Sequence, residues 1–263
     1  MRLDPSAQAA ERRLVEAARS GTPCAPIRDL VGVGEIATAY AIQAQISADR
    51  VLAGDGIVGR KIGLTNVRVQ QQLGVEQPDF GVIFESRAYG SEEPIETAIF
   101  LQPKIEAEIA FVLARDITSD RGPITREMVT NAIAFAAPAL EIVDSRIADW
   151  DISIVDTVAD NASFGGFLLG AERLPIADID VVAEAMILDV NGVEHSSGSG
   201  ADCLGDPIEA VRWLAQTVDG LGSPLRAGEI VLSGALGPMV EVDAGHTVTA
   251  RFSNLGTVVA TFI

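Results

Sequence analysis

The feature that most constrains this chain is an alternating stretch from Leu101 to Phe111, which reads LQPKIEAEIAF. Side chains alternate across a strand with a period of two, so apolar residues share one face here and polar residues share the other. This alternation predicts a half-buried strand. Its polar face carries Glu106 and Glu108 side by side. Two carboxylates that close repel each other, and each resists ionisation unless a cation lies between them.

A third acid bears on how this strand is interpreted. Hard divalent cations such as Mg²⁺ and Mn²⁺ prefer carboxylate ligands, whereas the spacing by itself favours a solvent-facing strand edge that carries charge. Glu141 interrupts the apolar run PALEIV over residues 138–143, and burying an acid there costs free energy unless it is paired or binds a metal. Arg146 could supply that pairing. Alternatively, the three acids together could form an open Mg²⁺ or Mn²⁺ site.

Composition narrows the class of protein. The chain has 263 residues, of which 48% are hydrophobic and 21% charged, so it is globular and long enough for a large core. Its formal net charge of −18 argues against nucleic acid or an anionic membrane as a partner. Two cysteines and two histidines give neither a zinc-binding spacing nor a disulfide framework. The charged start and the lack of a long apolar run lead us to expect a cytoplasmic protein.

The order of the expected elements predicts an α+β fold. Caps, turn residues and periodicity predict helices over residues 4–20, 35–52, 66–73, 125–135 and 206–221. Strands are predicted over residues 57–64, 101–111, 138–143, 183–190, 193–197, 229–233, 247–252 and 257–262. The Asn191-Gly192 pair predicts a hairpin. Strands and helices do not alternate regularly, which argues against a doubly wound parallel sheet.

Two other charged residues differ from their surroundings. Lys61 lies between apolar neighbours, where it is either a surface lysine or a lysine directed into a pocket to bind a carboxylate or transfer a proton. Asp79 follows a proline at a strand entrance, where it is either a turn former or a general acid or base. The stretch VDTVADNASFGG, residues 155–166, predicts a loop or short helix that lines a site, with a capped surface turn as the alternative.

Several motifs together resemble one family: GRKIGLT (59–65), QQQLGVEQPDFG (70–81), LQPKIEAEIAFVL (101–113), PALEIVDSRI with DW (138–150), VDTVADNAS (155–163) and GALGPMV (234–240). They resemble the 2-keto-4-pentenoate hydratases of the fumarylacetoacetate hydrolase superfamily, which act in the meta-cleavage degradation of aromatic compounds. The resemblance runs from about residue 57 to the C-terminus. It implies a mixed β-roll core with flanking helices, an N-terminal helical segment over residues 1–55 and a catalytic domain over residues 56–263.

The resemblance also implies a set of site residues. These are Glu106, Glu108 and Glu141 for holding Mg²⁺ or Mn²⁺, Lys61 and Asp79 for catalysis, and Ser163 and Arg146 for binding the substrate. The sister enzymes are the 4-oxalocrotonate decarboxylases, which share the glutamates and the VADNAS stretch but lack an aspartate in the QPDFG turn. Asp79 therefore favours the hydratase.

The implied activity is hydration of 2-hydroxypenta-2,4-dienoate, or a close analogue, to a 4-hydroxy-2-oxoalkanoate. Protonation at C5 would give an α,β-unsaturated ketone, and water would then add at C4. Asp79 is expected to be the acid or base, with Lys61 as its partner or as a clamp for the substrate carboxylate. Decarboxylation of a 2-oxo-enedioate and a non-catalytic role in a pathway complex are the alternatives. By analogy we expect a homo-oligomer, and an association with a decarboxylase or aldolase of the pathway.

Overall fold

The computed structural model describes residues 3–66, 70, 75, 77–91, 93–120 and 122–263. The helix expected over residues 66–73 lies largely outside these described residues. The helices are α1 (Pro5–Ser20), α2 (Arg28–Val31), α3 (Ile36–Leu52), α5 (Arg126–Ala132), α6 (Ile154–Ala159) and α7 (Pro207–Gly220). The strands are β1 (Ile57–Gly63), β2 (Asp79–Phe84), β3 (Ala88–Tyr89), β4 (Pro103–Leu113), β5 (Ile133–Asp144), β6 (Phe164–Leu169), β7 (Ala185–Val190), β8 (Val193–Ser199), β9 (Ile230–Ala235), β10 (Val240–Glu241), β11 (Thr247–Phe252) and β12 (Gly256–Thr261).

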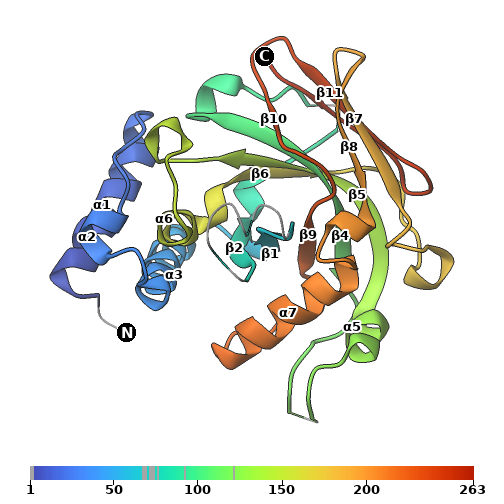
Figure 1. Cartoon of the computed structure of the whole chain (residues 1–263), viewed down its shortest axis with the longest axis horizontal. Coiled ribbons are helices and arrows are strands. Elements are labelled where there is room, and N and C mark those ends of the chain that lie inside the picture. Colours follow the sequence, from blue (N-terminus) through green and yellow to red (C-terminus); the bar gives the residue numbers. More distant parts are fainter. Residues whose placement is uncertain (1–2, 67–69, 71–74, 76, 92, 121) are drawn as a thin grey trace.

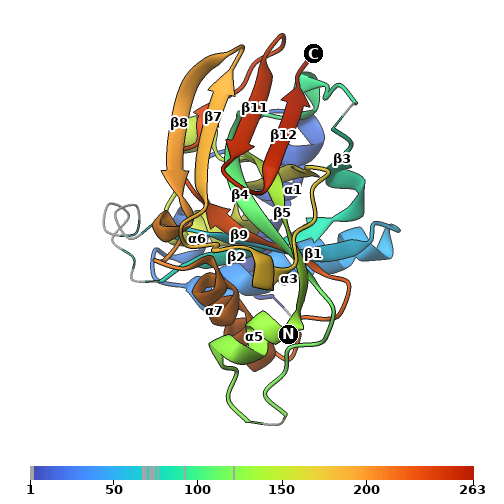
Figure 2. The ribbon, with the colours of Figure 1, turned by 90° about the vertical axis from the view of Figure 1, so that its right-hand side faces the viewer.

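A large curled sheet forms the centre of the molecule (Figure 1). Its strand order is β2-β1-β9-β4-β5-β6-β3, and β10 pairs with β4 outside this path. β1 and β9 run parallel, as do β3 and β6, whereas β4 is antiparallel to both of its neighbours β5 and β9. A smaller sheet, β12-β11-β7-β8, stands beside the large one (Figure 2). The sheets are mixed and the helices lie around them, so the fold is α+β as predicted.

The core lies around β4 and β5, the longest strands of the large sheet. Ile105, Ile109 and Phe111 on β4 are fully buried, and so is Leu214 on α7, which belongs to the same apolar cluster. Full burial of one such side chain contributes about 1.5–3 kcal/mol. The strand differs from the half-buried one expected, because Glu108 on its polar face is also fully buried. Both faces of β4 are therefore covered at Glu108.

The N-terminal helices pack against α6 on one side of the sheet (Figure 1). Asp4 caps α1 by accepting a hydrogen bond from the backbone N–H of Ala7 at 2.8 Å. Leu14 on α1, Ile42 on α3 and Val155 on α6 lie in one buried apolar cluster. The N-terminal segment therefore covers the element that carries part of the VADNAS stretch.

The helix expected over residues 125–135 is shorter, and the strand expected from Pro138 begins earlier. α5 ends at Ala132, and β5 begins at Ile133 and continues through Pro138. Proline inside a strand needs a place where its missing N–H has no ladder partner. The Pro138 carbonyl accepts the N–H of Gly170 at 2.8 Å, so its ring nitrogen faces the same edge, just past the end of β6 at Leu169. The strand therefore tolerates proline there.

The turn and helix signals in the second half of the chain are confirmed. Asn191 and Gly192 both have positive φ, 52° and 80°, and join β7 to β8. α7 begins after Asp206, whose side chain accepts the N–H of Ile208 at 2.8 Å.

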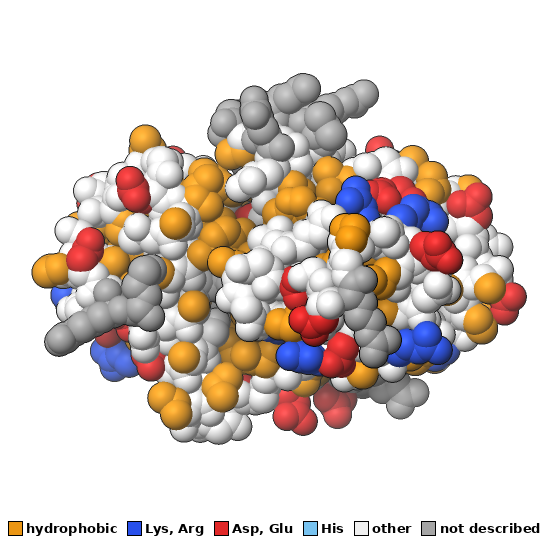
Figure 3. Space-filling view, turned by 90° about the horizontal axis from the view of Figure 1, so that it is seen from below, with side chains coloured by type: hydrophobic (Ala, Val, Ile, Leu, Met, Phe, Trp, Pro, Cys, Tyr) orange, Lys and Arg blue, Asp and Glu red, His pale blue; other side chains and the backbone are white. Residues whose placement is uncertain are grey.

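The surface mixes charges of both signs. Figure 3 shows acidic and basic side chains next to one another on the face that contains α5 and α7. Arg126 on α5 lies 2.7 Å from Asp206, and Arg212 lies 2.5 Å from Glu209 on α7. Among the described residues, no helix has both the length and the apolar character needed to span a membrane.

Candidate active site and metal centre

Three glutamates from two neighbouring strands meet inside the large sheet. Glu106 on β4 is paired directly with Glu141 on β5, and Glu108 lies two residues further along β4. Directly paired residues and residues two apart point to the same face of a sheet, so all three carboxyl groups share one face. One oxygen of each lies within 4.8 Å of the others. Glu108 and Glu141 are fully buried and Glu106 is partly exposed, which excludes the charged surface edge weighed above.

Several of these carboxylate oxygens have no hydrogen-bond donor. Glu108 Oε2 accepts the backbone N–H of Gly234 at 2.8 Å. Among the described residues, Glu108 Oε1 and both oxygens of Glu141 accept no hydrogen bond, although Glu141 Oε1 forms an ion pair with Lys61. Buried polar atoms are normally satisfied, and an unsatisfied one costs about 1–3 kcal/mol or more if charged. The cluster is therefore incomplete as a purely protein structure.

Gly234 reaches Glu108 because β9 has an irregular register at this point. The pairing of β4 with β9 shifts between Glu108 and Ala110, which marks a bulge. Gly234 has φ of 110°, and a Cβ there would lie 2.4 Å from the side chain of Thr65. Only glycine fits this conformation and this contact. The bulge thus directs a backbone N–H at Glu108, where a regular strand would use it in the ladder.

Lys61 lies beside this cluster and is almost fully buried, with 3% of its surface exposed. Its Nζ is 3.1 Å from Glu141 Oε1 and donates a hydrogen bond to the carbonyl of Ala162 at 2.9 Å. The cation next to Glu141 is therefore Lys61 and not Arg146, which corrects the alternative pairing. Lys61 and Glu141 are far apart in the sequence, and their strands are not neighbours in the sheet, so Lys61 reaches Glu141 across the curled sheet.

The four acids around Lys61 cannot all ionise easily. Burial, followed by the charge of Glu141, raises the pKa of Glu106 to about 7 against the opposing effect of Lys61. Burial likewise raises the pKa of Glu108 and of Glu141. Burial alone would lower the pKa of Lys61, but the charge of Glu141, followed by that of Asp79, raises it. A divalent cation would relieve this repulsion, and the carboxylate oxygens that lack a hydrogen-bond donor could coordinate it. These residues therefore fit a hard divalent metal ion.

Asp79 is the first residue of β2 and lies next to Lys61. It is 2% exposed; its Oδ2 is 3.4 Å from Thr157 Oγ1, and its Oδ1 accepts no side-chain hydrogen bond among the described residues. Burial raises the pKa of Asp79, and the charge of Lys61 only partly offsets this. Gly63 makes room for it, since a Cβ at Gly63 would lie 2.1 Å from Asp79 Oδ1. Asp79 is thus a buried acid that holds its proton more tightly than an ordinary aspartate does.

A strained turn, residues 161–163, contacts Lys61 and Thr157 beside Asp79. Asn161, Ala162 and Ser163 have positive φ of 55°, 50° and 55°, a region that costs free energy for residues other than glycine. The Asn161 carboxamide accepts the N–H of Val82 at 2.7 Å and donates to its carbonyl at 2.9 Å. This double hydrogen bond holds the turn against β2. As a result, the Ala162 carbonyl points at Lys61, and Ser163 Oγ lies 3.5 Å from the hydroxyl of Thr157.

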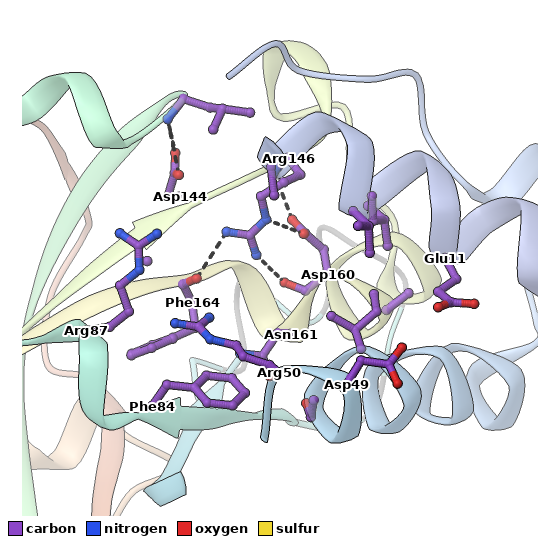
Figure 4. Close-up of a pocket in the computed structure, with 18 of the residues that line it drawn as sticks. Glu11, Asp49, Arg50, Phe84, Arg87, Asp144, Arg146, Asp160, Asn161 and Phe164 are labelled. Carbon is purple, nitrogen blue, oxygen red and sulfur yellow. Dashed lines mark hydrogen bonds and ion pairs between the residues drawn. The ribbon is translucent and has the colours of Figure 1, made fainter. Parts of the chain in front are cut away.

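Arg146 lies apart from the other candidate site residues. Its backbone N–H and guanidinium bind the carboxylate of Asp160, and its Nη1 donates to the carbonyl of Phe164 at 3.1 Å (Figure 4). The structure therefore brings Lys61, Asp79, Ser163 and the glutamates together and leaves Arg146 outside this group. The substrate-binding roles of Ser163 and Arg146 stay predictions.

Sequence reasoning missed several residues that complete the site. The backbone groups of Gly234 and Ala162 contact Glu108 and Lys61, and no side-chain pattern reports such contacts. Gly234 directly follows the strand predicted over residues 229–233, and β9 continues through it to Ala235, so the prediction did not indicate this contact. Thr157 and Asn161 fall in the stretch predicted to line a site, but their partners depend on the strained turn.

The site and the fold match one protein family. Residues 57–263 match the family model described as fumarylacetoacetate (FAA) hydrolase C-terminal. The chain is 52% identical over 260 residues to a 2-keto-4-pentenoate hydratase of Burkholderia vietnamiensis (strain G4 / LMG 22486), which covers 98% of each chain. It is 43% identical over 249 residues to a 2-hydroxyhexa-2,4-dienoate hydratase of Comamonas testosteroni, which covers 94% of this chain and 93% of that relative.

A solved structure supports the same assignment. The 4-oxalocrotonate decarboxylase from Pseudomonas putida G7, complexed with magnesium and adipate, has a TM-score of 0.92 to this chain at 29% identity. The match covers 98% of this chain and 97% of that one. Together with the buried acids on β4 and β5, these matches show that the chain belongs to the fumarylacetoacetate hydrolase family.

Proposed function

We propose that this protein is a hydratase of the meta-cleavage degradation of aromatic compounds. It adds water to 2-hydroxypenta-2,4-dienoate, or a close analogue, and releases a 4-hydroxy-2-oxoalkanoate. The observation that carries the proposal is the group of buried acids with orphaned oxygens next to one buried lysine. Relatives that are 52% and 43% identical over nearly their whole length are named as hydratases of such dienoates.

Glu106, Glu108 and Glu141 would hold Mg²⁺ or Mn²⁺. Both ions accept carboxylate oxygens and leave positions for water and substrate, and the 4-oxalocrotonate decarboxylase was solved with magnesium. When bound, the ion supplies Lewis acidity toward the substrate oxygens. The chain's own contribution is to fix the ligands: Gly234 N–H holds Glu108, and Lys61 lies beside Glu141.

Asp79 and Lys61 would carry the proton transfers. Asp79, whose pKa is raised by burial, would deliver a proton to C5 while the 2-hydroxyl of the dienol passes its proton to solvent water. The ionised Asp79 would then take a proton from the water that adds at C4, and solvent water would return a proton to C3. Lys61 stays protonated among these acids and stabilises the ionised form of Asp79.

The proposal is tested by assaying turnover of 2-hydroxypenta-2,4-dienoate with EDTA and after adding back Mg²⁺ or Mn²⁺. We expect loss of dienol absorbance that requires the metal and disappears in Glu106→Gln. Glu241→Gln is the matched control, because Glu241 lies on β10 opposite Lys104 with 82% of its side chain exposed. Undiminished hydration by Glu106→Gln, or by the wild type in EDTA, would refute the metal-dependent mechanism.

Decarboxylation is the second candidate, because the decarboxylase of Pseudomonas putida G7 has the same fold at a TM-score of 0.92. CO₂ release from 4-oxalocrotonate separates the two activities. We expect none above background, since the QPDFG turn that contains Asp79 resembles that of the hydratases. Faster CO₂ release than dienoate hydration would reverse the assignment.

We also propose, by analogy with the family, that the chain forms a homo-oligomer and associates with a decarboxylase or aldolase of its pathway. Light scattering on the purified protein tests the first statement. Co-elution with a purified pathway decarboxylase or aldolase tests the second. A monomeric mass, or separate elution of the two proteins, would contradict the corresponding statement.

A further inference from the structure

A cavity separate from the glutamate cluster lies between the N-terminal helices and the sheet. Its volume is about 380 Å³, within the roughly 300–1,000 Å³ of small-molecule sites. Its apolar walls come from α1, α3, β2, β6 and the segment before β4, through Leu14, Val15, Ile46, Phe84, Ile99 and Phe164. None of the three metal-binding glutamates lines it. The cavity is thus distinct from the glutamate cluster, and it has enough apolar surface to hold an organic molecule.

Three arginines surround one end of this cavity. Figure 4 shows the guanidinium groups of Arg50, Arg87 and Arg146 around the same region, close to Phe84 and Phe164. Arg50 lies over the ring of Phe84, 4.0 Å from its centroid. Burial lowers the pKa of Arg50, and the charges of Arg87 and Arg146 lower it further against the opposing effect of its partner Asp55. Three guanidinium groups therefore meet at this end of the cavity, next to the carboxylates of Asp144 and Asp160.

Arg87 differs from the other two arginines in its partners. Arg50 is paired with Asp55 at 2.5 Å, and Arg146 is paired with Asp160. Within the described part of the chain, Arg87 forms no ion pair, and its Nη1 donates to the hydroxyl of Tyr89 at 3.3 Å. Arg87 is only partly buried, so the rest of its guanidinium is accessible to a ligand.

The acids that line the cavity are unevenly placed. Asp144 accepts hydrogen bonds from the backbone N–H groups of Leu101 and Gln102 at 2.9 and 2.7 Å, so its carboxylate is stabilised by the backbone. Glu11 on α1 and Asp49 on α3 lie on the side away from Arg87 (Figure 4). The acids at the arginine end, Asp144 and Asp160, therefore already accept hydrogen bonds, whereas Arg87 has no acidic partner among the described residues.

We propose that this cavity binds a small monocarboxylate with an apolar body. The planar guanidinium of Arg87, next to Arg50, receives the carboxylate, because its N–H groups match the two carboxylate oxygens. The body lies against the apolar walls, and Glu11 and Asp49 repel a second negative charge at the far end. This site goes beyond the proposed hydration, since it lies outside the glutamate cluster and selects its ligand by charge pattern rather than through a metal.

The test is calorimetric titration of the Mg²⁺-loaded protein with hexanoate, hexan-1-ol and adipate. These ligands share one chain length and carry one, no and two negative charges. We expect hexanoate to bind, hexan-1-ol to bind at least about tenfold more weakly, and Arg87→Gln to weaken hexanoate by about tenfold, the value of one charge-assisted contact. Arg226→Gln is the control, because Arg226 is an exposed arginine paired with Asp116. Asp49→Asn should strengthen the binding of adipate.

Two results would overturn the proposal. One is hexanoate binding that is absent or equal in wild type and Arg87→Gln. The other is a crystal soaked with 6-bromohexanoate whose bromine signal lies outside the cavity, and this measurement on wild-type protein does not depend on the variants folding. Bromine density between α1, α3 and Phe84 is the expected result.

Discussion

Two kinds of buried carboxylate in this protein have opposite surroundings. Asp156 on α6 accepts the backbone N–H groups of Ile27 at 2.8 Å and Arg28 at 3.0 Å, the Arg28 guanidinium at 2.7 Å, and the backbone and hydroxyl of Ser153. Burial by itself would raise the pKa of Asp156, but these hydrogen bonds outweigh it and lower the pKa. Asp156 therefore joins the N-terminal segment to α6 as a stable anion.

The glutamate cluster shows the reverse pattern. Glu108 and Glu141 keep oxygens that no described residue satisfies, and burial raises the pKa of both. The difference teaches how to interpret a buried acid. One saturated by backbone N–H groups anchors a segment of chain, whereas one with orphaned oxygens, grouped with others, is prepared for a ligand from outside the chain.

The largest expected effect comes from removing a charge in the cluster. Glu141→Gln should lower dienoate turnover by at least about 10³-fold, beyond the roughly 10–100-fold typical of losing an outer-shell partner of a metal. Thermal unfolding in EDTA should change little, because the loss of one mutually repelling acid offsets the loss of the ion pair with Lys61. Loss of folded protein together with activity would mean that Glu141 is structural, like Asp156.

Asp79→Asn tests the catalytic role of Asp79, which lies outside the three-glutamate cluster. It should lower turnover by about 10²–10⁴-fold, the usual worth of a general acid or base, while Mn²⁺ binding is retained. Incorporation of deuterium at C5 of the dienoate in D₂O, followed by NMR, measures the proton delivery directly. Normal deuterium incorporation by Asp79→Asn would assign the C5 proton to another group.

Removing the carboxylate of Asp156, whose oxygens already accept hydrogen bonds, should lower stability and leave turnover chemistry intact. Asp156→Ala removes several hydrogen bonds and should lower the free energy of unfolding by about 2–4 kcal/mol. Metal binding per folded chain should stay normal, because Asp156 contacts Ile27 and Arg28 at the start of α2 and not the glutamates. Urea denaturation and a Mn²⁺ titration separate the two effects. Loss of metal binding by folded Asp156→Ala would erase the contrast between the two groups.

The strained turn offers a smaller and more local test. Asn161→Ala removes both hydrogen bonds to Val82 and should lower kcat by about tenfold with a smaller change in KM, because the Ala162 carbonyl that holds Lys61 is displaced. Asn191→Ala is the matched control, since Asn191 also has positive φ, 52°, but lies in the β7–β8 hairpin. It should lower stability and leave kcat unchanged. Equal kcat losses in both variants would indicate a general effect of stability.

The smallest expected effect is a pH dependence of stability. The pKa of Glu106 in the folded, metal-free protein is about 7, above the ordinary value of 4.5. The folded state therefore favours the protonated form, and this stabilisation is complete below pH 4.5 and lost as pH rises through 7. The unfolding temperature in EDTA should fall by a few degrees across that range relative to Glu106→Gln, and the stabilisation by Mg²⁺ should grow. Parallel pH profiles for the two proteins would contradict the raised pKa.

Much of the fold could be predicted from local signals. The alternation of β4, the Asn191-Gly192 turn and the Asp206-Pro207 start of α7 each depend on residues close in sequence. The boundary between α5 and β5 was misplaced, because helix and strand propensities compete there and the partner of Pro138, Gly170, lies just past the end of β6. Tertiary pairing decided that boundary.

The candidate site was predictable in its charges but not in their contacts. The acids on β4 and β5 interrupt apolar runs, so their cost is visible in the sequence. The partner of Glu141 was not visible, since Lys61 lies on β1 and reaches it across the curled sheet. Arg146 follows Glu141 closely in sequence, yet it pairs with Asp160 because the chain turns away after β5. Sequence proximity was a poor guide to pairing here.

The most direct test of the central claim is a crystal structure of the Mn²⁺-soaked protein with anomalous diffraction data. We predict a strong manganese peak between β4 and β5, with oxygens of Glu106, Glu108 and Glu141 at metal-ligand distances on the order of 2 Å. A strong manganese peak at another place in the structure would contradict the account. So would full hydratase activity with no metal among these glutamates.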